Sequence, residues 1–208
     1  MKVYFLQILR KDPNGATILK SAFDGSDYSF FQRGSVQEFM SFTDQILIER
    51  TAVGTRASVH ENEYVCHAHV RPDPIVGADV GPNSAHLAAV AITNGAYDPD
   101  VAFSMIDRLL DDFDQNTQGS WRYIPNEAAC GYANMQGFQA RFQNPVGADA
   151  VIEPAVAQAQ KAVHMNIQAV LNPGETLDNL VLHNASLTDQ SKRFYSQARN
   201  LNNGCICV

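Results

Sequence analysis

The last four residues, Cys205-Ile206-Cys207-Val208, are the part of the chain whose residue types and spacing most directly indicate chemistry. They fit the C-a-a-X pattern, in which the thiol of the first cysteine is alkylated by a prenyl group. The sequence contains no run of about 18 apolar residues, the length that a membrane-spanning helix needs. We therefore expect any membrane attachment to come through a lipid on Cys205 or through an amphipathic surface.

A second group of reactive residue types consists of Cys66, His60, His67 and His69. Residues two apart in a strand share a face, so His67 and His69 could both ligate a metal ion. No carboxylate or third ligand follows at a suitable spacing, and we interpret them as partly exposed histidines on a sheet. Cys66 beside them resembles a nucleophile with its base, but a cysteine within an apolar strand is usually a small core residue. We predict no metal site and no cofactor.

Composition and motifs narrow the class of protein further. The 208 residues carry a formal net charge of −7, which argues against a nucleic-acid partner and provides no polybasic patch for anionic membranes. The four cysteines match no zinc framework and no signal peptide opens the chain, so we expect a reducing cytosol. Neither a Gly-rich phosphate loop nor a G-x-S-x-G motif is present, which makes an enzyme the least favoured class.

The first two thirds of the chain have the pattern of an antiparallel sheet with helices on its faces. Asp12-Pro13-Asn14-Gly15 predicts the turn of a hairpin, and Ser35 with Glu38 predicts a capping box at the start of the first helix. Asp98-Pro99 predicts the start of a second long helix. The expected strands are 3–10, 16–23, 55–60, 63–71 and 87–93, and the expected helices are 35–49, one from Asp98, and a short one within 128–142.

The last quarter of the chain has the three-four apolar spacing of an amphipathic helix. The stripe is interrupted once, at Asn172-Pro173-Gly174, where proline disfavours a continuous helix. We expect two helices, roughly 154–171 and 175–200, with a bend at 172–174. The clearest hinge, Asn144–Gly147, separates a domain at 1–140 and a linker at 141–150 from this tail at 151–202 and a lipidation tail at 203–208. The stripe consists of Val156, Ala159, Val163, Ile167, Val170, Leu177, Leu180, Leu187, Phe194 and Leu201.

A set of short motifs spread along the chain carries a family resemblance. These motifs are residues 29–33, 35–40, 42–43, 49–50, 54–59, 66–67, 70–71, 101–103, 109–113, 143–145, 174–175, 177–178, 180–181, 190–192 and 194–195. With them, nearly the whole chain resembles the prenylated, YKT-type SNARE proteins, which carry a longin domain. The run from Ser29 to Val59 is the most specific part of the resemblance.

The resemblance implies an α+β fold: a profilin-like longin domain, with a five-stranded antiparallel sheet sandwiched by helices, followed by a helical SNARE (coiled-coil) segment. It implies a tail that assembles with partner SNAREs of the Q type into a four-helix bundle, which docks and fuses vesicles. The implied layers of that bundle are Val156, Ala159, Val163, Val170, Pro173, Leu177, Leu180, Leu187, Phe194 and Leu201.

The resemblance also implies a cycle between two states. In the cytoplasm the tail and the prenyl chain fold back onto the longin domain, in a groove lined by Phe39, Phe42 and Ile46. The open form is held by lipid at the cytoplasmic face of Golgi, endosomal or vesicle membranes. Neither an enzymatic activity nor a cofactor is implied.

The sequence departs from the family in three places. Pro173 stands at the central ionic layer, where the family has an arginine, and proline costs about 3 kcal/mol inside a helix. Gly204 stands where the family carries a second lipid-acceptor cysteine, and a single prenyl chain gives only marginal attachment. The loop 72–86 is longer than usual and is interpreted as a surface insertion.

Pro173 leaves an alternative function open. The chain could be a longin adaptor or regulatory protein with a degenerate SNARE tail that binds partners without fusing membranes. Entry into an SDS-resistant four-helix complex distinguishes the two functions.

Overall fold

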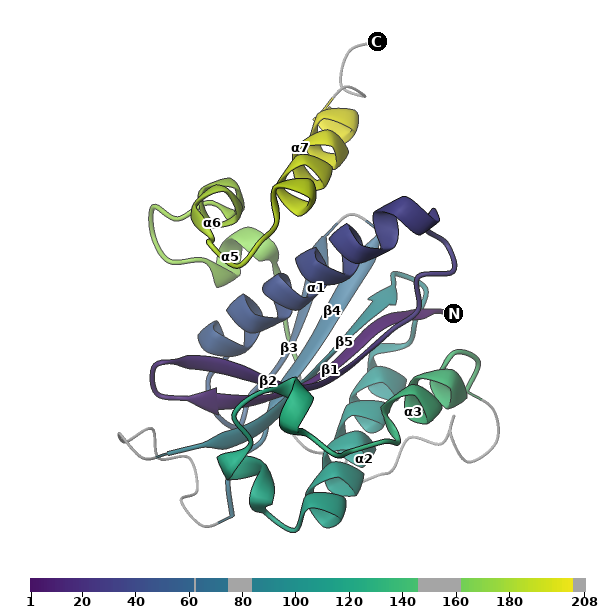
Figure 1. The fold of residues 1–208 in the computed structure, drawn as a ribbon, viewed down its shortest axis with the longest axis vertical. Coiled ribbons are helices and arrows are strands. Elements are labelled where there is room, and N and C mark those ends of the chain that lie inside the picture. The colour runs from purple at the N-terminus through teal and green to yellow at the C-terminus, as the bar shows by residue number, and fades with distance from the viewer. Residues whose placement is uncertain (62, 75–83, 146–161, 204–208) are drawn as a thin grey trace.

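A mixed six-stranded sheet lies at the centre of the molecule, with different helices on its two faces (Figure 1). The computed structural model describes residues 1–61, 63–74, 84–145 and 162–203, with side chains described up to 197 in the last helix. The strands, in the order β2-β1-β5-β4-β3-β6, are β1 Val3–Asp12, β2 Gly15–Phe23, β3 Arg56–Glu61, β4 Tyr64–Val70, β5 His86–Asn94 and β6 Val163–Asn166. The α-helices are α1 Phe30–Arg50, α2 Pro99–Thr117, α3 Met135–Phe142, α5 Ile167–Val170, α6 Leu177–His183 and α7 Asp189–Asn203.

The predicted hairpin, strands and second long helix are confirmed, with ends that differ by a few residues. Asp98 caps α2 through its side chain, which accepts a hydrogen bond of 2.9 Å from the Asp100 amide, and Pro99 is the first helical residue. The apolar stripe from Val101 to Phe113 is buried against one face of the sheet, together with α3. Two short 3-10 helices, Ser120–Tyr123 and Glu127–Ala129, connect α2 to α3.

Helix α1 covers the opposite face of the sheet and begins earlier than predicted. Its N-cap is Ser29, whose amide and hydroxyl donate to the side-chain oxygen of Gln32 at 3.3 and 2.7 Å. Ser35 is buried inside the helix, so the capping box predicted at Ser35 and Glu38 is wrong. Ser29 with Gln32 has the same spacing one turn earlier, and local sequence alone does not decide between two such boxes.

A short strand from the tail, β6, adds a sixth member to the expected five-stranded sheet. It pairs in parallel with the edge strand β3, with Val59 opposite Met165. The helix predicted for 154–171 is therefore wrong over 163–166, and residues 146–161 lie outside the description. An edge strand presents unpaired backbone groups that a nearby segment can satisfy. The fold remains α+β, as predicted, although the sheet is mixed rather than wholly antiparallel.

The two strand histidines are buried rather than partly exposed, which corrects the sequence-based interpretation. The ring of His67 lies 3.0 Å from Ser58 Oγ and 3.2 Å from Thr93 Oγ1. Burial, followed by the nearby charges of two other histidines, lowers the pKa of His67 to about 4. His69 Nδ1 lies 2.8 Å from Asp107 Oδ1. Both histidines thus have structural partners on the α2 face of the sheet.

Candidate functional site

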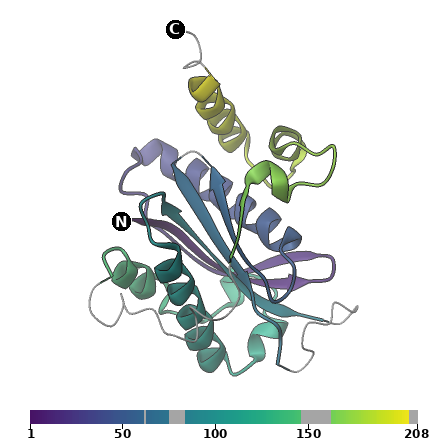
Figure 2. The same ribbon diagram turned by 180° about the vertical axis from the view of Figure 1, so that it is seen from behind.

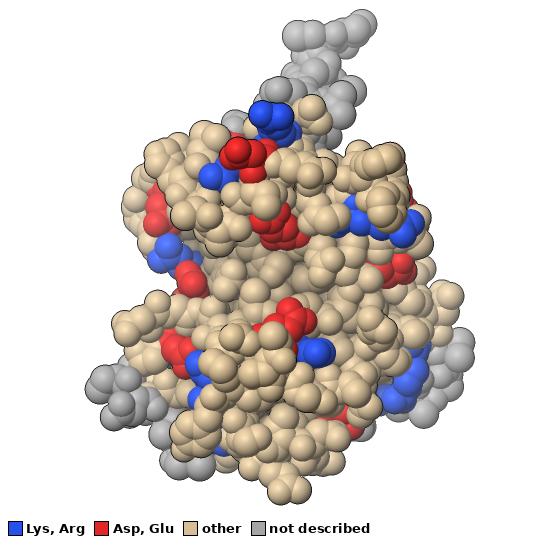
Figure 3. All heavy atoms as spheres, viewed as in Figure 1, with Lys and Arg blue, Asp and Glu red and all other residues tan. Residues whose placement is uncertain are grey.

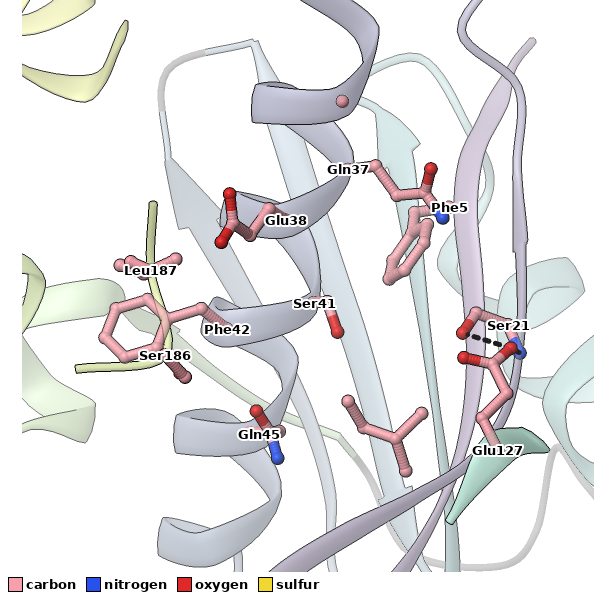
Figure 4. A pocket seen from close by; sticks show the side chains of 12 residues that line it. Phe5, Ser21, Gln37, Glu38, Ser41, Phe42, Gln45, Glu127, Ser186 and Leu187 are labelled. Carbon is pink, nitrogen blue, oxygen red and sulfur yellow. Dashed lines mark hydrogen bonds between the residues drawn. The ribbon is translucent and has the colours of Figure 1, made fainter. Parts of the chain in front are cut away.

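The tail helices α5, α6 and α7 lie beside α1 (Figures 1 and 2). Phe42 and Ile46 of α1 are buried in one cluster with Leu171, Val181 and Leu187 of the tail. Figure 4 shows the ring of Phe42 beside Leu187. Around this centre pack Phe39, Leu177, Leu180 and Tyr195, which are partly buried. We call these nine residues the tail contact.

The aromatic residue Phe39 extends the tail contact along α1 towards α7. Its ring stacks on that of Tyr195, with centroids 5.2 Å apart. The hydroxyl of Tyr195 donates to Asp178 Oδ1 at 2.7 Å, which ties α7 to α6. The contact therefore fixes the two tail helices to each other as well as to α1.

Glu38 of α1 makes a polar contact with the start of α7. Its carboxylate accepts hydrogen bonds from the amide and the hydroxyl of Thr188, both at 2.7 Å, and from the hydroxyl of Ser191. Partial burial raises the pKa of Glu38, but these hydrogen bonds outweigh it, so the net pKa lies below the usual value of 4.5. The ionised carboxylate is thus the form that holds α7 in place.

At the other end of α1, an ion pair joins the helix to the turn between α5 and α6. Arg50 Nη2 lies 3.2 Å from both carboxylate oxygens of Glu175. The same carboxylate accepts from the amide of Asn172 at 2.9 Å, and the Glu175 amide donates to the Asn172 carbonyl at 3.0 Å. Pro173 and Gly174 lie within this turn, and Gly174 adopts a φ of 86°, which favours glycine.

A cavity of about 540 Å³ opens between α1 and strands β1 and β2, next to the tail contact. Figure 3 shows acidic side chains on either side of a hollow on this face. The carboxylate of Glu127, which lines the cavity, already accepts hydrogen bonds from the amide and hydroxyl of Ser21 at 2.8 and 2.9 Å. The cavity lining is Phe5, Ile18, Ser21, Gly34, Gln37, Glu38, Ser41, Phe42, Gln45, Glu127, Ser186 and Leu187 (Figure 4).

Of the predicted site residues, some are buried in the structure, some are exposed, and some lie outside the described part of the chain. Phe42 and Ile46 are buried under the tail, whereas Val163 lies on β6 with half of its surface exposed. Val170 is buried in the core cluster between α1 and the sheet, and Phe194 packs against the same cluster. Pro173 is exposed. Val156, Ala159 and Cys205, and the side chain of Leu201, lie outside the description.

Three members of the tail contact were not predicted as site residues: Leu171, Val181 and Tyr195. Val181 follows Leu177 by four residues and so lies on the same helical face, which is a signal that the sequence contained. Leu171 lies just before the turn at Pro173, where helical spacing no longer applies.

Two features of the described residues bear on metal binding and on thiol reactivity. Among them, no three His, Cys, Asp or Glu side chains gather to hold a metal ion. Burial raises the pKa of the Cys66 thiol well above its usual range, which suppresses the reactive thiolate. No helix in the described parts of the chain is long and apolar enough to cross a bilayer.

Comparison with protein families gives the class of protein. The longin model, a regulated-SNARE-like domain, matches residues 25–138, and the synaptobrevin model matches residues 150–207. A longin domain followed by a synaptobrevin segment defines an R-type SNARE that acts in vesicle fusion.

Curated relatives then give the particular family. The chain is 32% identical to Synaptobrevin homolog YKT6 of Debaryomyces hansenii over 212 residues, which cover all of both chains. It is 33% identical to the Yarrowia lipolytica homologue over 213 residues, again all of both chains. It is 31% identical to the Schizosaccharomyces pombe homologue over 209 residues, which cover 99% of each. The chain belongs to the YKT6 family of synaptobrevin homologues.

Proposed function

We propose that this SNARE alternates between a closed form, in which the tail is docked on α1, and an open form that assembles with partner SNAREs of the Q type. One observation carries the proposal. Leu177, Leu180 and Leu187, whose side chains a four-helix bundle would bury, are packed against α1 in the tail contact. The same apolar surface cannot be buried twice, so docking and assembly exclude each other.

The chain divides accordingly into four functional parts. Residues 1–140 are the longin domain, 141–150 the linker, 151–202 the SNARE segment with its bend at 172–174, and 203–208 the lipidation tail. A prenyl group on Cys205 attaches the open form to the cytoplasmic face of Golgi, endosomal or vesicle membranes, while the closed form resides in the cytoplasm. Neither an enzymatic step nor a cofactor takes part.

Membership of a family of fusion SNAREs favours this function over a non-fusogenic adaptor. Assembly requires β6, α5 and the turn at Pro173 to convert to a helix that supplies the bundle layers. The layers are Val156, Ala159, Val163, Val170, Pro173, Leu177, Leu180, Leu187, Phe194 and Leu201.

Replacing Phe42 by alanine tests the proposal. Phe42 faces the tail rather than the sheet, so the substitution removes apolar contact from the docked state and leaves the longin core intact. We expect the variant to form an SDS-resistant complex with partner SNAREs at least about tenfold faster, since tenfold corresponds to only about 1.4 kcal/mol of lost docking free energy.

Gln37→Ala is the matched control, because Gln37 is exposed on the same helix and lies outside the tail contact. Hydrogen exchange of residues 177–187 in the free protein gives the second measurement. It should accelerate in Phe42→Ala and stay unchanged in Gln37→Ala. Equal assembly rates and equal exchange in both variants contradict the closed form.

A further inference from the structure

Two histidines face each other across the strand pair that joins the tail to the sheet. His60 lies on β3 and His164 on β6, and their ring centroids are 6.0 Å apart. Both side chains are exposed. In the parallel register Ser58 is opposite His164, and His60 is opposite Asn166, so the two rings are diagonal neighbours. Figure 2 shows the light-green chain running along this sheet edge into α5.

Strand alternation places both rings on the same face of the sheet. Val59 and Met165, which are paired in the register, belong to the apolar cluster under α1. Successive side chains in a strand point to opposite faces, so His60 and His164 point to the face that α2 covers elsewhere. Ser58, on that same face, contacts His67. Glu61 follows His60 by one residue and therefore lies on the other face.

The separation of the rings fits a shared metal ion. Two imidazoles bound to one zinc ion at about 2.0–2.1 Å have ring centroids about 5 Å apart at a tetrahedral angle, and about 6 Å apart at a wider angle. The observed 6.0 Å lies in that range. Both side chains are exposed, so no packing prevents the small torsional rotations that bring one nitrogen of each ring to the ion.

The chemistry of the two rings suits a transition metal. Imidazole nitrogen is a preferred ligand of zinc, copper and nickel. Among the described residues, no hydrogen bond engages either ring, so their nitrogens are available. His67, the nearest other histidine, already has both ring nitrogens next to Ser58 and Thr93 hydroxyls. An ion held by His60 and His164 would therefore take its remaining ligands from water rather than from His67.

We propose that His60 and His164 form a two-imidazole site for a divalent transition-metal ion such as Zn²⁺, and that the ion clamps the tail to the longin domain. One ligand belongs to the domain and the other to the tail, so the site exists only while β6 is paired with β3. By linkage, an ion that binds only the docked tail favours the closed form. The inference rests on the closed form of the proposed function and assigns a ligand that regulates it.

Metal binding is tested on the full-length, reduced protein by calorimetric titration with Zn²⁺ at pH 7.5. His60→Ala and His164→Ala should each weaken binding by at least the factor of about 10–100 that the loss of an outer-shell partner costs a metal site. His183→Ala is the control, because His183 is an exposed tail histidine on α6, away from β3. Any zinc bound by the C-terminal cysteines is common to all four proteins, so the differences isolate the pair.

Hydrogen exchange of residues 163–166 tests the clamp itself. At free Zn²⁺ about 100 times the dissociation constant, protection of β6 should rise by up to about 100-fold in the parent protein and in His183→Ala. It should not change in the two other variants. Equal zinc affinity in all four proteins, or zinc-independent protection of β6 in the parent, overturns the clamp and leaves the closed form standing. A β6 that exchanges freely in every protein, with or without zinc, overturns the closed form as well.

Discussion

Asp44 is a buried acid on the sheet-facing side of α1 with an unusual electrostatic position. Within the described structure neither of its carboxylate oxygens has a hydrogen-bond partner. Burial raises its pKa well above the usual value of 3.8, and Asp44 is close enough to Cys66 to raise the pKa of that thiol as well. The fold therefore favours the neutral acid, while the unfolded chain ionises it at its usual pKa.

Asp44→Asn should stabilise the longin domain at neutral pH. Because the carboxyl pKa is raised in the folded state, the free energy of unfolding falls as pH rises above the pKa of the unfolded chain, by up to about 1.4 kcal/mol per pH unit while the folded acid stays protonated. The stability gained by the variant should therefore be larger at pH 7 than at pH 5, as measured by urea unfolding. Asp100→Asn, at an exposed residue of α2, is the control. A gain that does not depend on pH contradicts the prediction.

Glu38 makes the docked tail sensitive to acid. Its pKa is lowered in the docked state, so its contribution to docking is fully present above the usual value of 4.5 and is lost as pH falls through the lowered pKa. Fluorescence energy transfer between α7 and the domain should report release in that range. Glu38→Gln should dock more weakly at pH 7 and lose less on acidification. Glu49→Gln, at an exposed residue of the same helix, should behave like the parent.

At the scale of elements, the features set by local sequence could be predicted, whereas those set by contacts between distant segments could not. Helix α2 was predictable because its cap at Asp98 and its stripe up to Phe113 are local patterns. Strand β6 was not, because Val163 and Met165 fit a helical stripe equally well, and only the open edge of β3 selects the strand. The groove residues Phe42 and Ile46 came from the family resemblance, whereas the contacts of Glu38 and Arg50 with the tail depend on how the tail turns.

Pro173 is the element-scale obstacle to assembly. The proposed open form needs a helix through the turn at 172–175, and proline costs about 3 kcal/mol inside a helix. Pro173→Ala should therefore raise the thermal stability of the four-helix complex. Pro173→Arg should raise it further if partner glutamines meet the restored charge. Melting of purified complexes measures both effects and separates helix continuity from the charged layer. Unchanged melting in both variants means that the helix does not pass through residue 173.

At the scale of the whole molecule, closing withdraws several parts of the chain from partners at once. The tail contact buries leucines of the SNARE segment, β6 occupies the sheet edge, and Glu38 and Arg50 hold the two ends of α1 to the tail. These contacts are spread along the chain, so loss of one weakens closure without abolishing it. In the proposed cycle, we therefore expect opening to become favourable when a partner helix or a membrane supplies a competing contact.

In the proposed function, membrane attachment depends on a single prenyl chain on Cys205. Such a chain would hold the protein only reversibly, because stable anchoring takes two signals and Gly204 supplies no second thiol. Gly204→Cys should add an acylation site and raise the ratio of membrane-bound to free protein in the native host by at least about tenfold, since each buried methylene contributes about 0.8 kcal/mol. Cys205→Ser should abolish membrane binding in the parent and in the Gly204→Cys background if prenylation must come first. Fractionation with mass analysis of the C-terminal peptide measures both effects. A doubly lipidated variant that partitions like the parent would show that docking of the tail, rather than lipid affinity, limits membrane attachment.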